Sequence, residues 1–516
     1  MSAEPVEKKP GSLALGALVF GAGIGALATE ITASRLLAPY FGSSTIVWAN
    51  LIGIVLGALA LGYWLGGRVA DKRPRPSLLG SIVLAAAVCV AAIPFVAKPF
   101  LDLTVKGLDD ASAGAVIGSF GAVLLLFAPP VVLLGVVSPF AIRLAVASIE
   151  TAGAVAGRLY ALSTAGSLLG TFLSALVLIP ALGTQRTFLV IAALLAVSSC
   201  LLLGARYLVV AAALAALVAV PPGAIKAEAG LLHEETSYYQ YIRVVERPDG
   251  RRVLELNEGV AIHSVWRSDS VLTGGEWDTF LAIPPLLDHP LGRVAILGNA
   301  AGTTARALGV YYPAAYIDGV ELDPAVSRVG RRYFPMDDNP RLSVHDADAR
   351  PFLRSTDRLY DLIVVDAYRQ PYVPFYLATR EFFRLVREHL APGGIVALNI
   401  AAVPDDKRLV RAVGTTLAAE FPQVLEWPAL RFNTIVLGLT EPLAEGEIAR
   451  RLQRGPADLD SLRELLARDA RPLEAAGRAW TDDRAPVEWL TDRMIVSYAA
   501  EGGRLDEDYL PTRPDP

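Results

Sequence analysis

Residues 294–308, VAILGNAAGTTARAL, and residues 316–324, YIDGVELDP, decide the fold of the second half of this chain. A short apolar run leads into a loop of small residues, a helical pattern follows, and a second apolar run ends in an acid. This order predicts a strand, a loop, a helix and a second strand, which is how a nucleotide-binding sheet begins. Apolar strands and amphipathic helices continue to alternate up to residue 400, so we expect a Rossmann-like, doubly wound and mostly parallel sheet.

The first half of the chain predicts an α-helical membrane bundle. A membrane-spanning helix needs about 20 apolar residues. We expect about seven such helices in residues 1–225, with two alternatives open: the last stretch, which ends in Pro-Pro-Gly, lies in the interface, or the stretch broken by Pro129-Pro130 holds more than one pass. Seven stretches without a charged side chain approach or reach the required length: 11–29, 44–67, 76–97, 111–142, 159–185, 187–205 and 207–225.

Basic residues predict how this bundle is oriented. Arg68, Lys72, Arg73 and Arg75 fall between the second and third stretches, and cytoplasmic loops are enriched in such residues. We therefore expect a multi-pass protein of the cell membrane with its N-terminus inside. Seven full spans would place the soluble half outside, but a cofactor made in the cytoplasm favours a cytoplasmic soluble domain.

Charge and composition limit the partners. Residues 1–225 carry a formal charge of +5 and the remainder −10, within a chain total of −5. An acidic soluble half argues against nucleic acid as a partner. Cys89 and Cys200 lie in apolar stretches, and the five histidines show no metal-ligand spacing, so we expect no metal. Glu30 and Arg35 form either a polar site for a cation or headgroup, or an interfacial arginine and a glutamate paired with another helix.

Residues 226–292 are expected to form a small β domain before the main sheet. Within 231–262 the chain predicts two strand segments, ETSYYQYIRVVE and RRVLELNEGVAI, joined by a PDG turn. A β-hairpin cap fits this pattern. The main domain then covers residues 293–516, including a C-terminal extension.

Ligands of such sheets bind beyond the carboxyl ends of the strands. The residues at these ends predict an adenosine-bearing ligand: small residues approach it at a helix N-terminus, and acids accept hydrogen bonds from ribose and adenine. The sequence has no lysine loop for phosphates, so a nucleoside cofactor without phosphates is favoured over ATP. In chain order the strand-end candidates are Gly298, Asn299, Ala300, Ala301, Gly302, Glu321, Asp346, Asp348 and Asp366.

On these motifs the chain resembles the spermidine synthase (aminopropyltransferase) family, which has a methyltransferase-type sheet. The resemblance runs from about residue 231 to about residue 440, and at most to TDDRAPVEWL at 481–490. The first half resembles bacterial proteins described as membrane-fused spermidine synthases. That likeness lies in EITASRLLAPYFGSS, GRVADKRPRP and GRLYALSTAGSLLGT.

The resemblance implies a role for each matched residue. Tyr239 and Gln240 match the Tyr-Gln pair that contacts cofactor and amine, and Tyr239 counts among the catalytic residues. Glu321 matches the ribose-binding acid and Asp348 the acid that contacts adenine. Asp366 matches the catalytic aspartate, which takes or orients a proton of the substrate amine. The implied co-substrate is decarboxylated S-adenosylmethionine or S-adenosylmethionine, used in polyamine biosynthesis without a metal.

Three positions depart from the family pattern. Ala301 stands where an aspartate binds the donor amine, and Arg369 stands where a second aspartate follows the catalytic one. The Tyr-His-Glu motif is replaced by residues 277–279, Trp-Asp-Thr, which leaves Asp278 as a substitute acid. Tyr368, Arg369 and Asp278 are therefore expected to bind substrate. Arginine binds carboxylates in bidentate fashion, so these changes favour a ligand with a carboxylate, unless Arg369 turns outward from its loop.

Three functions remain open from the sequence. The first is a membrane-anchored transferase that moves an aminopropyl-type group to a small amine. The second is a methyl- or aminocarboxypropyl transferase that uses S-adenosylmethionine itself. The third is a transporter or sensor whose nucleoside-binding domain regulates the helices without catalysis. Expected partners are the amine, the lipid bilayer and a second copy in a homodimer.

Overall fold

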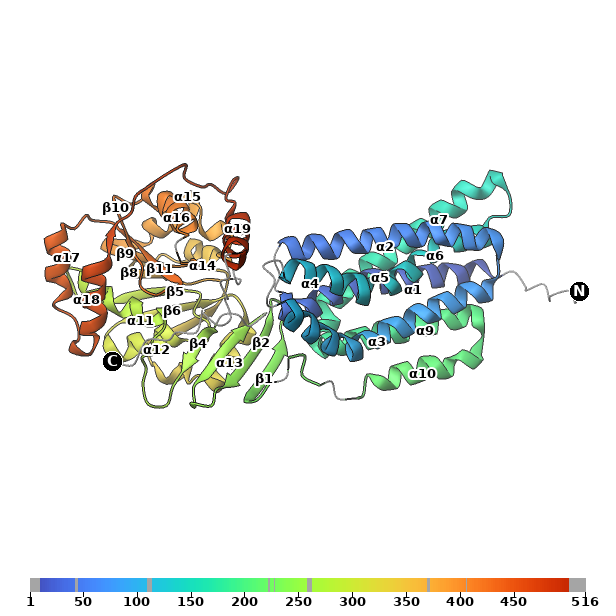
Figure 1. The fold of residues 1–516 in the computed structure, drawn as a ribbon, viewed down its shortest axis with the longest axis horizontal. Helices are drawn as coiled ribbons and strands as arrows, with labels where there is room; N and C mark the ends of the chain where they lie inside the picture. The colour runs from blue at the N-terminus through green and yellow to red at the C-terminus, as the bar shows by residue number, and fades with distance from the viewer. Residues whose placement is uncertain are drawn as a thin grey trace, which may run out of the picture. The chain divides into compact units, whose positions relative to one another are not determined.

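The computed structural model describes residues 10–41, 45–108, 114–220, 223–226, 228–257, 262–368, 372–404 and 406–500. The chain divides into two compact units (Figure 1). The first comprises residues 1–228 and 235–241, and the second comprises residues 229–234 and 242–516. The first unit is helical, whereas the second contains all of the main sheet.

Six helices of the first unit, within the described residues, are long and apolar enough to cross a membrane. The stretch 111–142 contributes a single span, Gly118–Ala145, and the seventh stretch forms only the shorter apolar helix Ala205–Leu217. The expectation of about seven spans therefore differs from the structure by this last helix. The elements are α1 (Ser12–Phe41), α2 (Thr45–Lys72), α3 (Pro76–Leu108), α4 (Gly114–Ala122), η1 (Val123–Phe127), α5 (Ala128–Gly135), α6 (Val137–Ala145), α7 (Ile149–Leu173), η2 (Ser174–Leu178), α8 (Ile179–Leu182), α9 (Thr184–Leu203), η3 (Ala205–Tyr207) and α10 (Leu208–Leu217).

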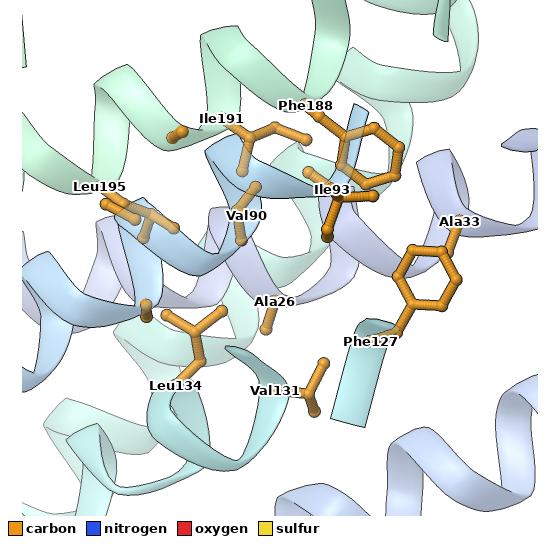
Figure 2. Close-up of a cluster of buried hydrophobic side chains, with 14 of the residues drawn as sticks. Ala26, Ala33, Val90, Ile93, Phe127, Val131, Leu134, Phe188, Ile191 and Leu195 are labelled. Carbon is orange, nitrogen blue, oxygen red and sulfur yellow. The ribbon is translucent and has the colours of Figure 1, made fainter. Parts of the chain in front are cut away.

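Small residues bring these helices together. A Cβ atom at Gly166 or Gly170 of α7 would lie 2.2 Å or 2.4 Å from a backbone carbonyl oxygen of α1, so these positions tolerate only glycine. Such close approach is typical of helices packed in membranes. Around it, apolar side chains from α3, η1 and α9 fill the interior, and the rings of Phe127 and Phe188 stack with centroids 6.2 Å apart (Figure 2).

The second unit is built on an eight-stranded sheet with the order β12-β10-β11-β9-β8-β5-β6-β7. Five strands are parallel: β5 (Arg293–Leu297), β6 (Tyr316–Glu321), β7 (Leu342–Asp346), β8 (Tyr360–Val365) and β9 (Leu390–Ala401). β11 (Asn433–Leu439) runs antiparallel to β9, and β10 (Gln423–Trp427) and β12 (Arg471–Pro472) follow it. The chain order reverses between β5 and β8, which makes this the switch point where doubly wound sheets bind ligands. The predicted α/β class and methyltransferase-type parallel sheet are confirmed.

Helices connect the strands and cover the sheet. Those of the second unit are α11 (Glu276–Thr279), η4 (Phe280–Ala282), η5 (Pro284–Leu286), α12 (Thr303–Tyr311), α13 (Pro324–Tyr333), η6 (Met336–Asp338), α14 (Ala349–Ser355), η7 (Phe375–Leu377), α15 (Arg380–Glu388), α16 (Arg408–Ala418), α17 (Glu445–Leu452), η8 (Ala457–Leu459), α18 (Asp460–Asp469) and α19 (Val487–Ala500).

A second, four-stranded sheet precedes the main one: β1 (Leu231–Thr236), β2 (Tyr241–Glu246), β3 (Arg252–Leu256) and β4 (Ile262–Trp266). The segment predicted as one strand, ETSYYQYIRVVE, is broken by a turn at 237–240, because the Ser237 hydroxyl accepts the backbone N–H groups of Tyr239 and Gln240, each at 3.0 Å. Apolar residues of β2 and β3 pack on α13. The expected role of this sheet as a cap stays a prediction.

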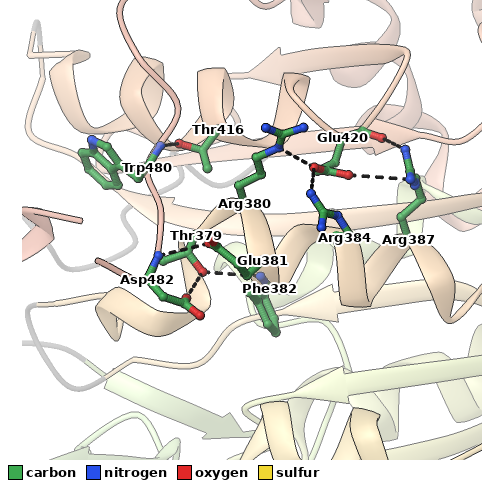
Figure 3. A network of polar contacts seen from close by, with 10 residues as sticks. All are labelled: Thr379, Arg380, Glu381, Phe382, Arg384, Arg387, Thr416, Glu420, Trp480 and Asp482. Carbon is green, nitrogen blue, oxygen red and sulfur yellow. Dashed lines mark hydrogen bonds and ion pairs between the residues drawn. The ribbon is translucent and has the colours of Figure 1, made fainter. Parts of the chain in front are cut away.

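The C-terminal extension is fastened to the sheet domain by polar contacts (Figure 3). Within the sheet domain itself, buried Glu420, just after α16, accepts from Arg380 and Arg384 of α15, at 2.6 Å and 3.3 Å. Asp482 accepts from the Thr379 hydroxyl at 2.7 Å, and it also pairs with both terminal nitrogens of Arg350 in α14, at 2.8 Å and 2.7 Å. The extension thereby braces the helix that follows β7.

Candidate active site

The loop from β5 to α12 brings the chain against the end of β8. Gly298 has φ 97°, and a Cβ atom there would lie 2.4 Å from the carbonyl oxygen of Asp366. Only glycine combines this left-handed backbone with such close approach. Gly302, at φ 84°, is the N-cap of α12, so the loop ends at a helix N-terminus, where backbone N–H groups are available to a ligand.

Glu321 lies at the end of β6 and faces this loop. Its two carboxylate oxygens accept the backbone N–H groups of Ala300, at 3.0 Å, and Asp323, at 2.9 Å. Burial raises the pKa of Glu321 to about 7. Asp323 itself caps α13 through the N–H of Ala325, at 2.9 Å, as the Asp-Pro sequence predicts. Glu321 is therefore not needed as a cap, and its remaining lone pairs can accept ribose hydroxyls.

The two acids after β7 have local partners. Asp346 is exposed and accepts the Ser327 hydroxyl at 2.6 Å. Asp348 caps α14 through the N–H of Arg350, at 3.0 Å, and accepts the Tyr376 hydroxyl at 2.8 Å. Asp348 is thus part of a bonded cluster at the same strand-end edge as Glu321, and its contact with adenine stays a prediction.

Asp366 directly follows β8. The side-chain amide of Asn399, on the neighbouring strand β9, donates to its Oδ1 at 2.9 Å. Asp366 is partly exposed to solvent, yet burial raises its pKa to about 7, while the Asn399 hydrogen bond acts in the opposite direction. A carboxylate in this state can exchange a proton near neutral pH.

Tyr368 is anchored two residues further along. Its hydroxyl donates to the Asn399 carbonyl at 2.8 Å and accepts the N–H of Ala401 at 2.7 Å. The phenol therefore holds the end of β9, and its predicted substrate contact stays a prediction. Arg369 lies outside the described residues.

Two residues of the glycine loop turn their side chains away from solvent. Ala301 is 1% exposed, and its methyl group packs in the apolar cluster formed with the small sheet and α13. The Asn299 amide is buried, and its Nδ2 atom lies 3.3 Å from the Met336 sulfur. Both residues are limited to backbone contact with a ligand.

Asp278 and its neighbour Glu276 differ in surroundings. The Asp278 carboxylate accepts the backbone N–H groups of Thr273, at 3.0 Å, and Gly274, at 2.7 Å, which favours a loop-closing role over substrate binding. Glu276 was not singled out from sequence. Burial, followed by the negative charge of Asp366, raises its pKa to about 8. In the sequence Glu276 is marked only as an acid two residues before Asp278. The charge of Asp366 acts on Glu276, so of these two acids Glu276 is the one that we assign to the surroundings of Asp366.

Tyr239 and Gln240 belong to the first unit, in the turn between β1 and β2. Arg35 of α1 donates to the carbonyl oxygens of Tyr238, at 2.5 Å, and Tyr239, at 3.1 Å. This contact gives Arg35 a partner that neither sequence alternative included. The predicted action of Tyr239 and Gln240 with Asp366 stays a prediction.

The described residues contain no group of three or more histidine, cysteine or acidic side chains that could hold a metal ion.

Sequence comparisons with known proteins point to one family. The family model described as spermine/spermidine synthase domain matches residues 279–427. A probable polyamine aminopropyl transferase of Bifidobacterium longum is 32% identical over 301 residues, 53% of this chain and 65% of that protein. A polyamine aminopropyltransferase of Vibrio vulnificus is 30% identical over 276 residues, 50% of this chain and 91% of that protein.

The crystal structure of a probable spermidine synthase from Corynebacterium glutamicum aligns with a TM-score of 0.39 and 23% identity, over 51% of this chain and 100% of that one. The present chain spans just under two thirds of the Bifidobacterium relative and nearly all of the Vibrio one. Its second unit holds the matched domain, the sheet and the strand-end acids. The chain belongs to the polyamine aminopropyltransferase family, which includes the spermidine synthases.

Proposed function

We propose that this protein is a membrane-anchored transferase that moves an aminopropyl-type group from decarboxylated S-adenosylmethionine to a small amine. One observation carries the proposal. Asp366, a partly exposed carboxylate with a pKa near neutrality, lies at the switch point of the sheet, against the Gly298 loop where a nucleoside would bind.

The chemistry needs little beyond alignment and one proton acceptor. The lone pair of the neutral amine attacks the methylene carbon next to the sulfonium, a carbon–nitrogen bond forms, and the carbon–sulfur bond breaks with its electrons going to sulfur. The amine proton passes to Asp366. A protonated amine is no nucleophile, so a carboxylate that attracts the cation and accepts its proton serves both needs.

Glu321 would hold the donor through its ribose, beside the backbone N–H groups that begin α12. Glu276 would supply a carboxyl group on the amine side, largely protonated at neutral pH, where the family pattern has acids that this chain lacks. Asp348 and Asp346 would lie toward the adenine.

Membrane anchoring is proposed for the first unit on two grounds. Its six long apolar helices satisfy the length requirement, and apolar side chains cover their outer surfaces. Leu56, Leu125 and Leu168 are each about 60% exposed, and such apolar surface is unfavourable in water. We place the transferase unit in the cytoplasm, where a nucleoside donor is made.

A second candidate is transfer from S-adenosylmethionine itself. The Ala301 position favours it, because the acid that the family pattern has there, and that would repel the carboxylate of this donor, is absent. The product would then be a methylated or aminocarboxypropylated amine.

The test is product analysis by mass spectrometry with the purified full chain in lipid nanodiscs. Each donor is offered with a panel of diamines and amino acids. The proposal expects amine-dependent release of methylthioadenosine with the decarboxylated donor. Faster turnover and tighter calorimetric binding with the carboxylated donor would transfer support to the second candidate, and no turnover with either donor would refute both.

Anchoring and sidedness are tested separately. The protein should stay with membranes after carbonate extraction. A cysteine introduced at exposed Glu445, in a background without Cys89 and Cys200, should react with an impermeant maleimide only in inverted vesicles. Reaction in intact cells would place the transferase unit outside.

A further inference from the structure

The Asp366 carboxylate accepts a hydrogen bond from the first of two linked side-chain amides. Asn399 of β9 donates to Asp366 Oδ1 through its Nδ2 atom at 2.9 Å. Asn433 of β11 donates through its own Nδ2 atom to the Oδ1 atom of Asn399, also at 2.9 Å. Asn399 and Asn433 are 5% and 4% exposed, so neither contact is replaced at no cost by bulk water.

The chain has a direction that follows from donor and acceptor chemistry. An ionised carboxylate only accepts hydrogen bonds, so Asn399 must turn its NH₂ group toward Asp366. Its carbonyl oxygen then faces Asn433, which must answer with an NH₂ group. Turning any member around would leave two acceptors or two donors facing each other in a buried site.

The strands fix this order. β9 and β11 are antiparallel neighbours in which Asn433 pairs with Ala401, two residues beyond Asn399. Tyr368 binds both the Asn399 carbonyl and the Ala401 N–H, at 2.8 Å and 2.7 Å. The backbone around Asn399 therefore cannot readily shift to adopt another pairing.

We propose that Asn433 is a positioning residue of the transferase. Through Asn399 it keeps an amide donor on one oxygen of Asp366, and so leaves the other oxygen to receive the amine proton. The catalytic role assigned to Asn433 rests on the proposed function. Asn433 lies on β11, two strands away in the sheet from β8, the strand that Asp366 follows.

The decisive variant is Asn433→Asp, which keeps the shape and removes the donor. Asn399 would then turn its NH₂ group toward the new carboxylate and present its oxygen to Asp366, which would have to be protonated to bond with it. Glu276, whose pKa is raised by the negative charge of Asp366, is unchanged by the substitution.

We expect the acid limb of the kcat/KM profile to move up by about one pH unit, and kcat at neutral pH to fall about tenfold. Asn433→Ala removes the donor without adding charge and should shift the limb in the same direction by less. Thr434→Val, one residue along the same strand, is the matched control and should leave the limb in place. A role limited to folding would lower activity at every pH without moving the limb, which would overturn the proposal.

A second readout does not depend on turnover. Infrared titration of the protonated carboxyl band, with Asp366→Asn identifying the Asp366 component, measures the protonation of this group directly. The component should titrate at higher pH in Asn433→Asp and in Asn433→Ala than in the unaltered protein. A titration that does not shift in the two variants refutes the chain of amides, even if the enzyme is active. A titration that does shift, when the unaltered protein shows no turnover, supports the chain of amides and refutes the proposed function.

Discussion

The donor side and the acceptor side of the proposed site hold their key carboxylates by different means. Glu321, at the end of β6, is bound by backbone N–H groups of the glycine loop and of Asp323. Asp366, at the end of β8, is bound by the side chain of Asn399, which is bound in turn by Asn433. Burial raises the pKa of both acids to about 7.

This difference separates what the fold supplies from what the side chains supply. Backbone N–H groups are placed by the strand-loop-helix path and persist through most substitutions, so nucleoside binding depends on the fold. Side-chain hydrogen-bond donors change with single substitutions. The acceptor side also contains the acid Glu276. Because this side is built from side chains, single substitutions can alter its specificity for the amine.

The largest effect is expected where both sides depend on one residue. Gly298→Ala would place a Cβ atom 2.4 Å from the Asp366 carbonyl oxygen at φ 97°, so the loop or the end of β8 must move. We expect loss of donor binding by calorimetry and loss of turnover together. Gly446→Ala is the matched control, because a Cβ atom there has nothing within 4 Å. Normal binding by the Gly298 variant would show that the two sides are not joined at this loop.

A smaller and one-sided effect is expected from Glu321→Gln. The amide keeps the size but loses the charge that strengthens hydrogen bonds from ribose. Donor affinity should fall about 10- to 100-fold, corresponding to roughly 1.5–3 kcal/mol. kcat at saturating donor should change much less. An equal fall in kcat would contradict the assignment of Glu321 to donor binding alone.

Stability should depend on pH through both sides. Burial raises the pKa of Glu321 and Asp366 to about 7 and that of Glu276 to about 8. The folded state therefore binds protons more tightly than the unfolded state, and stability falls as pH rises from about 4.5 to about 8. The thermal midpoint of the ligand-free protein should follow this fall, and Glu276→Gln should flatten it. A midpoint that rises over the same window would contradict the assignment.

The smallest effect is expected from the ion pair between Asp482 and Arg350, which fastens the C-terminal extension to α14. Asp482→Asn removes the charge that pairs with Arg350, which is 8% exposed, in the helix capped by Asp348. We expect a loss of about 1 kcal/mol in the free energy of unfolding and a slightly weaker donor affinity. Asp469→Asn breaks an exposed pair with Arg468 and should change neither quantity. Unchanged stability in Asp482→Asn would remove the brace from the account.

The sequence predicted the parallel sheet, the glycine loop and the acids at the strand ends, because strand ends of one sheet meet at one edge. It did not separate Glu276 from Asp278, since two acids on one short helix differ only in tertiary contacts such as those to Thr273. The partnership of Asn399 with Asn433 depends on an antiparallel register across 34 residues, which no local pattern encodes. The turn at 237–240 was not predicted, because the strand-like residues around Ser237 gave no sign that its hydroxyl accepts backbone N–H groups.

The most direct test of the central claim pairs two measurements on Asp366→Asn in the full chain. The account predicts that the donor still binds with nearly unchanged affinity by calorimetry, because Glu321 and the glycine loop are intact. It predicts that amine-dependent product formation falls by about 100-fold or more, because no carboxylate accepts the proton. Turnover equal to that of the unaltered protein would contradict the account.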